Sequence, residues 1–192
     1  MGERFWSIEY SAGTVLILSF VALFVGALMY WVRGGIRGGA PPTHVYFVWE
    51  RGFIMAAVVL TALGLALLEG LLQDSAGRVL ARAGAIAYLF GGVLVVAVEA
   101  SSLSQGLHRN DSEQNWAPAN IYVVLALLAQ AAIGGSLLQA GLLPAWIGWV
   151  TIVWNAAWLL AFVIKRDDIY IPFVHHFMPL VIGIALVSHA AS

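Results

Sequence analysis

The sequence has no cysteine among its 192 residues, and only 10% of the residues are charged. The absence of cysteine excludes disulfides, thiolate metal ligands and cysteine nucleophiles. Soluble domains carry about 25% charged residues, so this chain has too few to cover a compact water-soluble body. Nine Lys and Arg residues and ten Asp and Glu residues give a formal net charge of -1. This balance offers no basic surface for nucleic acid.

Apolar residues dominate what is present: they make up 61% of the chain, and the mean hydropathy is +0.90. A membrane-spanning helix needs about 20 mostly apolar residues, because backbone groups in lipid must satisfy their own hydrogen bonds. Stretches of this kind cover residues 12–32, 46–72, 80–103, 119–140, 144–164 and 171–190. We therefore predict an all-α bundle of six transmembrane helices, a single domain over residues 1–192, with both termini on the same side.

Charged or Gly/Pro-rich segments separate these stretches. The glycine-rich segment 33–39 follows the first, and residues 104–118 form the one long polar loop. Gly141 and Pro144 divide an uncharged run that is too long for one helix, because glycine commonly ends a helix and proline commonly begins one. Residues 165–168, Lys-Arg-Asp-Asp, close the fifth stretch.

The distribution of cations predicts the orientation in a cell membrane. The loops after the first, third and fifth spans, which we call the odd-numbered loops, lie on one side of the membrane. This side has six cations: Arg33, Arg37, Arg51, Arg109, Lys165 and Arg166. The side of the termini has three, Arg4, Arg78 and Arg82. Because cytoplasmic loops carry an excess of Lys and Arg, we expect both termini on the non-cytoplasmic side.

Several ionisable residues lie inside the predicted spans: Glu50, Arg51, Glu99, His175 and His176. Each would cost about 2.5–3.5 kcal/mol in hydrocarbon, so each needs a reason. At 1.5 Å per residue, all five fall within roughly 10 Å of the side that carries the odd-numbered loops. One interpretation is a polar pocket opening to that side, with Arg51 as the counter-ion of the carboxylates. The other is that these side chains neutralise one another near the headgroups or extend outward to them.

Helical stripes add two residues to the predicted pocket. Gly84, Tyr88, Gly91, Val95 and Glu99 recur at three- or four-residue spacing in the third span, where small residues allow close helix packing. A comparable stripe in the fifth span contains Asn155 and Trp158. The predicted ligand pocket thus contains Glu50, Arg51, Glu99, Asn155, Trp158, His175 and His176.

Pro179 marks a further feature of the last span. Proline has no N–H, so the carbonyl of His175, four residues earlier, loses its helical partner. Freed carbonyls in membrane proteins usually face a cavity or a donor from another helix.

Three chemistries fit these residues. Glu50 and Glu99 are candidate catalytic groups for acid–base chemistry on an apolar substrate. A cation could use His175 and His176 with the carboxylates, but adjacent residues of a helix diverge by about 100°, and no HExxH motif is present. A b-type haem could pair one of these histidines with His44 or His108. No cofactor is clearly implied, and no GxxxxGK[ST], GxGxxG, GxSxG or DDxxD motif occurs.

The segment 141–149, GLLPAWIGW, and the later segment 179–186, PLVIGIAL, carry a resemblance. They resemble the carboxyl-terminal half of a family of bacterial multi-span membrane proteins defined as a domain of unknown function. The resemblance implies a bacterial inner-membrane protein of six or seven helices, with no activity to transfer. The pair Trp49-Glu50 is similar to integral-membrane terpene cyclases, which use paired acids and typically have seven helices.

These observations leave several functions open. The sequence favours an accessory or interaction subunit, or a protein that binds an apolar ligand. The expected partners are membrane lipid, an apolar small molecule, and a protein partner or second copy of the chain, with no nucleic acid. Alternatives are an intramembrane enzyme that uses paired carboxylates, and a haem- or metal-binding membrane protein.

Overall fold

The computed structural model describes residues 7–35, 43–105, 117–165 and 174–191, and these residues form six helices with no strand. The helices are α1 (Ile8–Gly35), α2 (His44–Leu71), α3 (Arg78–Gln105), α4 (Ala117–Ala140), α5 (Ala145–Lys165) and α6 (Val174–Ala191). Each is long and apolar enough to cross a membrane. The predicted all-α class and the six membrane-spanning stretches are confirmed.

The helix bounds differ from the predicted spans mainly at the ends. α1 begins four residues before the predicted span and extends to Gly35. Several predicted features fall outside the described residues: the glycine-rich segment beyond Gly35, loop residues 106–116, charged residues 166–168, and positions 171–173 of the last span. The predicted division of the uncharged run is confirmed. Gly141, with φ +62°, follows α4, and Pro144 precedes α5.

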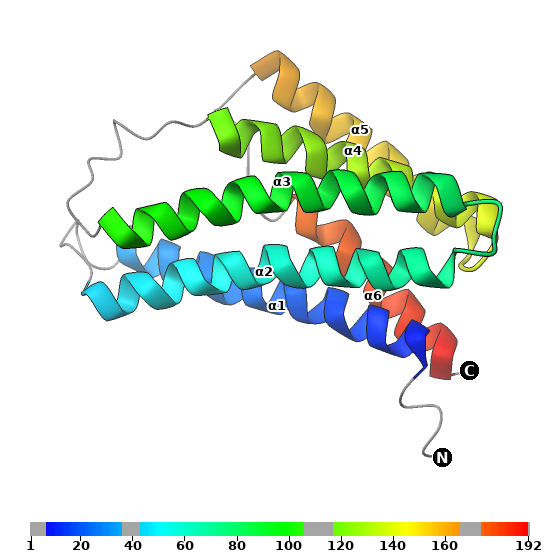
Figure 1. Ribbon diagram of the computed structural model, residues 1–192, viewed down its shortest axis with the longest axis horizontal. Helices are drawn as coiled ribbons and strands as arrows, with labels where there is room; N and C mark the ends of the chain where they lie inside the picture. Colours follow the sequence, from blue (N-terminus) through cyan, green and yellow to red (C-terminus); the bar gives the residue numbers. More distant parts are fainter. Residues whose placement is uncertain (1–6, 36–42, 106–116, 166–173, 192) are drawn as a thin grey trace.

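The helices pack in a closed ring, in which each contacts the next along the chain and α6 returns to α1 (Figure 1). α6 runs obliquely between α1 and the α4–α5 pair, and it also contacts α4. The first turns of α1 and the last turns of α6 lie at the same end of the bundle (Figure 1). Close packing holds them there, because a Cβ atom at Gly13 would lie 2.7 Å from the carbonyl oxygen of Gly183.

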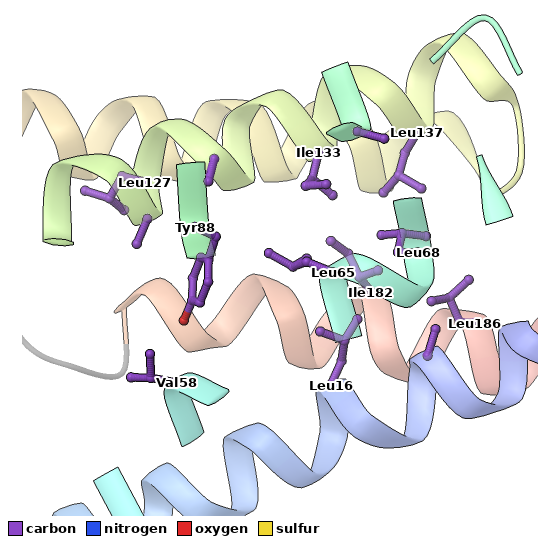
Figure 2. Close-up of a cluster of buried hydrophobic side chains, with 14 of the residues drawn as sticks. Leu16, Val58, Leu65, Leu68, Tyr88, Leu127, Ile133, Leu137, Ile182 and Leu186 are labelled. Atoms are coloured by element: carbon purple, nitrogen blue, oxygen red, sulfur yellow. The ribbon is translucent and has the colours of Figure 1, made fainter. Parts of the chain in front are cut away.

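Leucine, isoleucine and a buried tyrosine fill the interior of the ring. Figure 2 shows Leu16, Leu65, Tyr88, Ile133 and Ile182 converging from five different helices. Large apolar side chains also cover the outside of every helix, a surface that fits lipid rather than water.

The predicted small-residue stripes prove to be packing surfaces. On α3, a Cβ atom at Gly84 would lie 2.7 Å from the carbonyl oxygen of Ala129 on α4. On α5, a Cβ atom at Gly148 would lie 2.8 Å from the carbonyl oxygen of Gly134, also on α4. Both stripes therefore let neighbouring backbones approach closely, as in other membrane helix pairs.

Candidate functional site

Four charged side chains meet at the end of the bundle where α1 ends and α2 begins; we call them the ionic cluster. Nη1 of Arg51 on α2 donates to both carboxylate oxygens of Glu99 on α3, at 3.1 Å for Oε1 and 2.8 Å for Oε2. Nε of Arg51 lies 3.5 Å from Oε1 of Glu50, and Nε of Arg33 on α1 lies 3.2 Å from Oε2 of Glu50. Arg51 thus lies between the two carboxylates, as predicted.

Arg33 is the member of the ionic cluster that the sequence analysis did not assign to the site. It was counted there only as a cation of the first loop, yet its depth, one residue beyond the predicted first span, matches that of Glu50. With Arg33 included, two guanidinium groups neutralise two carboxylates on three helices. The Glu50 carboxylate is fully buried, whereas the arginines remain 15–21% exposed. Each carboxylate is thus paired with an arginine of the cluster. These ion pairs connect α1, α2 and α3.

A second polar group, the histidine cluster, lies in the middle of the bundle and contains His175, His176, Tyr88, Tyr122 and Thr61. The Tyr122 hydroxyl lies 2.7 Å from Nε2 of His175 and 3.0 Å from the Tyr88 hydroxyl. Nδ1 of His176 lies 3.2 Å from the Thr61 hydroxyl. All five side chains are buried, and they come from α2, α3, α4 and α6.

The hydrogen bonds of Thr61 define the state of His176. The Thr61 hydroxyl donates its proton to the carbonyl of Ala57 at 2.9 Å, so it accepts from Nδ1–H of His176. In a neutral imidazole this leaves Nε2 as an acceptor. That atom is buried and has no hydrogen-bond partner among the described residues.

The prediction that the histidines share one layer with the ionic residues was wrong. Thr61 follows Glu50 by 11 residues on α2, and Tyr88 precedes Glu99 by 11 on α3, which is about 16 Å along each helix. The reason is the short last helix. α6 has 18 residues, and the carbonyl of its first residue, Val174, accepts a hydrogen bond from Trp154 halfway along α5. The first turn of α6 therefore lies at mid-bundle.

The two remaining residues of the predicted pocket lie apart from the ionic cluster. α5 packs mainly on α4 and α6, whereas the ionic cluster is built on α1, α2 and α3. Asn155 Nδ2 donates to the carbonyl of Thr151 on its own helix at 2.7 Å. Trp158 packs against the apolar core, with its ring centroid 6.1 Å from that of Trp154. The predicted single pocket is thus divided, because the ionic cluster lies apart from the histidines and from these two residues of α5.

The structure does not bring together the predicted metal or haem ligands. Within the described residues, no group of three or more His, Asp and Glu side chains is placed to hold a metal ion. His44 is exposed at the start of α2, 17 residues or about 26 Å along the helix from the level of Thr61 and His176. His108, the other candidate haem partner, lies outside the described residues.

A groove of about 720 Å³ runs between α2 and α3 on the outside of the ring. Its α2 wall is Val58, Val59, Ala62, Leu63, Ala66 and Glu69, and its α3 wall runs from Arg82 to Ala100. The lining is apolar except for Glu69 and Arg82. None of the seven predicted pocket residues lines this groove.

The sequence analysis missed the groove because it depends on how two helices pack against each other. A Cβ atom at Gly92 would lie 3.0 Å from Val58 Cγ1, so the helices approach closely at that point. Small residues line the rest of the groove on both helices and leave space between them: Ala62, Ala66, Ala85, Ala97 and Ala100. These alanines were the available signal in the sequence.

Comparison with protein-family models, curated proteins and solved structures finds no match for the chain. The class of the protein therefore follows from its own architecture. Six long apolar helices, an apolar exterior and a closed helical ring define a multi-pass integral membrane protein.

Proposed function

We propose that this protein binds an apolar, chain-bearing ligand from the lipid phase in the groove between α2 and α3. The observation that carries the proposal is the groove itself, with its volume of about 720 Å³ and almost wholly apolar walls. Ligand sites typically enclose about 300–1,000 Å³ and combine apolar walls with a few polar groups. The groove has this composition, and its position on the outside of the ring gives a membrane ligand direct access.

The membrane and the orientation of the protein are part of the same proposal. We infer a bacterial cell membrane from the resemblance of the carboxyl-terminal half to the multi-span family described above. The excess of cations on the side of the odd-numbered loops supports non-cytoplasmic termini. In this orientation the ionic cluster lies near the cytoplasmic face, and Glu69 and Arg82 lie near the opposite face.

The ionic cluster supports this function better than acid–base catalysis. Its two carboxylates each bind a guanidinium group, at 2.8 Å for Glu99 and 3.2 Å for Glu50. Such contacts fix α1, α2 and α3 relative to one another, and α2 and α3 form the walls of the groove. We therefore assign the ionic cluster a role in holding the groove rather than in reacting with its occupant.

Substitutions that fill the groove test the proposal. Ala62→Phe and Ala97→Phe place large side chains between the helices, whereas Ala157→Phe adds the same bulk to the exposed face of α5. Native mass spectrometry of protein purified in mild detergent should detect a bound lipid-like mass in the wild type and in Ala157→Phe. The mass should be lost from both groove variants. Equal retention by the groove variants, or no bound mass in the wild type, would overturn the proposal.

A further inference from the structure

The groove has one charged end, formed by two side chains of opposite sign. Glu69 lies in the last turns of α2 and Arg82 in the second turn of α3, and a short turn over residues 72–77 joins these helices. In the part of the chain that the structure describes, neither side chain forms an ion pair. All the other residues that line the groove are apolar or glycine.

Uncompensated charges beside lipid call for partners. Ionisable side chains within membrane helices are costly unless they pair with a group of opposite charge. The ionic cluster meets that requirement internally. At the end of the groove it is not met, so the missing partners must come from the groove's occupant or its surroundings.

We propose that the occupant is a phospholipid whose headgroup carries a primary amine. Its phosphate binds Arg82, its ammonium group binds Glu69, and one acyl chain lies along the groove. This inference rests on the proposed function and names the class of ligand for the same groove.

The groove is long enough for one acyl chain. From Glu69, the groove follows α2 as far as Val58, 11 residues or about 16 Å away. From Arg82, it follows α3 as far as Ala100, 18 residues or about 27 Å away. A single leaflet accounts for about half of the ~30 Å hydrocarbon core. A lipid with its headgroup at Glu69 and Arg82 would therefore extend one chain through the apolar part of the groove.

The two charges select among headgroups. A planar guanidinium group offers paired N–H donors that match phosphate oxygens, so Arg82 favours any phospholipid over an uncharged lipid. A carboxylate accepts hydrogen bonds from a primary ammonium group, which carries three N–H donors. A quaternary choline group has none, and the net negative charge of a phosphoglycerol headgroup is repelled by Glu69. The expected order of binding is ethanolamine, then choline, then glycerol.

The charges in and beside the turn do not change this balance. Asp74 in the turn and Arg78 at the start of α3 are both exposed at the same end of the bundle, and neither lines the groove. They add one charge of each sign. They also provide matched control positions, because each has the charge of one groove residue.

The test uses the full-length protein, stripped of lipid and incorporated into nanodiscs. The nanodiscs contain equal amounts of phosphatidylethanolamine, phosphatidylcholine and phosphatidylglycerol with identical acyl chains. Retained lipids are counted by native mass spectrometry. The wild type should retain phosphatidylethanolamine about tenfold over the others, a ratio that corresponds to about 1.4 kcal/mol.

The variants separate the two contacts. Glu69→Gln should abolish the preference for ethanolamine over choline, and Arg82→Gln should lower retention of all three lipids, with partial rescue in Arg82→Lys. Asp74→Asn and Arg78→Gln should match the wild type. Thermal unfolding of each variant in detergent shows whether it remains folded. If Arg82→Gln does not fold, Arg82→Lys still tests the contact with the phosphate.

The outcomes distinguish this inference from the proposed function. If Ala62→Phe loses all bound lipid while the wild type retains the three headgroups equally, the groove binds chains but the headgroup inference is wrong. A preference for phosphatidylglycerol, or equal losses in Asp74→Asn and Glu69→Gln, overturns it as well. If Ala62→Phe retains lipid like the wild type, the proposed function itself fails.

Discussion

The side-chain amide of Gln130 on α4 donates a hydrogen bond to the backbone carbonyl of His175 on α6. This carbonyl lies four residues before Pro179, which has no N–H to offer it. The sequence analysis predicted that the carbonyl would lose its helical partner, and the structure identifies the replacement. Gln130 is 1% exposed, so a buried side chain of one helix satisfies the backbone of another.

Replacing Gln130 should therefore be costly only while Pro179 is present. Gln130→Met keeps the approximate side-chain length but leaves the His175 carbonyl unsatisfied, which should cost about 1–3 kcal/mol of unfolding free energy. In a Pro179→Ala background, the N–H of residue 179 can bond to that carbonyl, and the same substitution should cost much less. Denaturant titration in detergent micelles measures all four proteins of the cycle.

Gln139→Met is the control for this cycle, because Gln139 lies on the same helix with an exposed side chain. It should leave the unfolding free energy unchanged in both backgrounds. An equal cost of Gln130→Met with and without Pro179 would show that the side chain stabilises the protein by some other contact.

Arg51 should be the most costly single loss from the ionic cluster. Arg51→Met leaves Glu99 without its ion-pair partner and Glu50 with Arg33 alone. Breaking one side of a buried ion pair typically costs about 3–5 kcal/mol. The double variant Arg51→Met/Glu99→Gln should be less destabilised than Arg51→Met, because it also removes the unpaired charge of Glu99 and leaves only the neutral Arg33–Glu50 pair. Unfolding free energies in detergent decide the order, and a double variant less stable than Arg51→Met would contradict it.

The crossing of α1 and α6 should tolerate no side chain at Gly183. A Cβ atom there would lie 2.8 Å from the carbonyl oxygen of Gly13, so Gly183→Ala should separate the helices at a cost of about 1–3 kcal/mol. Gly52→Ala on α2 is the matched control, because a Cβ atom at Gly52 meets nothing within 4 Å. Melting temperatures of the two variants should differ clearly, and equal values would show that this crossing is not tightly packed.

Single-cysteine labelling should verify the topology, since the chain has no cysteine of its own. Thiols introduced at Ser11 and at Ser192, which lies outside the described residues, should react with an impermeant maleimide from the same side. A thiol at His44 should react from the opposite side, because one helix separates Ser11 from His44. The expected side for His44 is the cytoplasm. Labelling of Ser11 and Ser192 from opposite sides would contradict six membrane crossings.

The features predicted correctly from sequence are those with local causes. Apolar length alone predicts a membrane helix, so the six spans could be located without knowing their neighbours. The effect of Pro179 on the His175 carbonyl follows from the covalent structure of proline. The position of Arg51 between Glu50 and Glu99 could be predicted because charge neutralisation in lipid leaves few partners at a given depth.

The rest was decided by tertiary structure, because it depends on how one helix is placed against another. The depth of His175 and His176 could not be counted from the ends of the spans, since α6 begins at the level of Trp154 in the middle of α5. The partner of the His175 carbonyl, Gln130, belongs to a helix 45 residues earlier in the chain. The groove likewise depends on small residues of α2 and α3 that lie opposite one another only when the two helices pack side by side. The sequence by itself determined which segments enter the membrane, because burying apolar residues in lipid is favourable. Packing between those segments determined which polar groups meet and where a ligand fits.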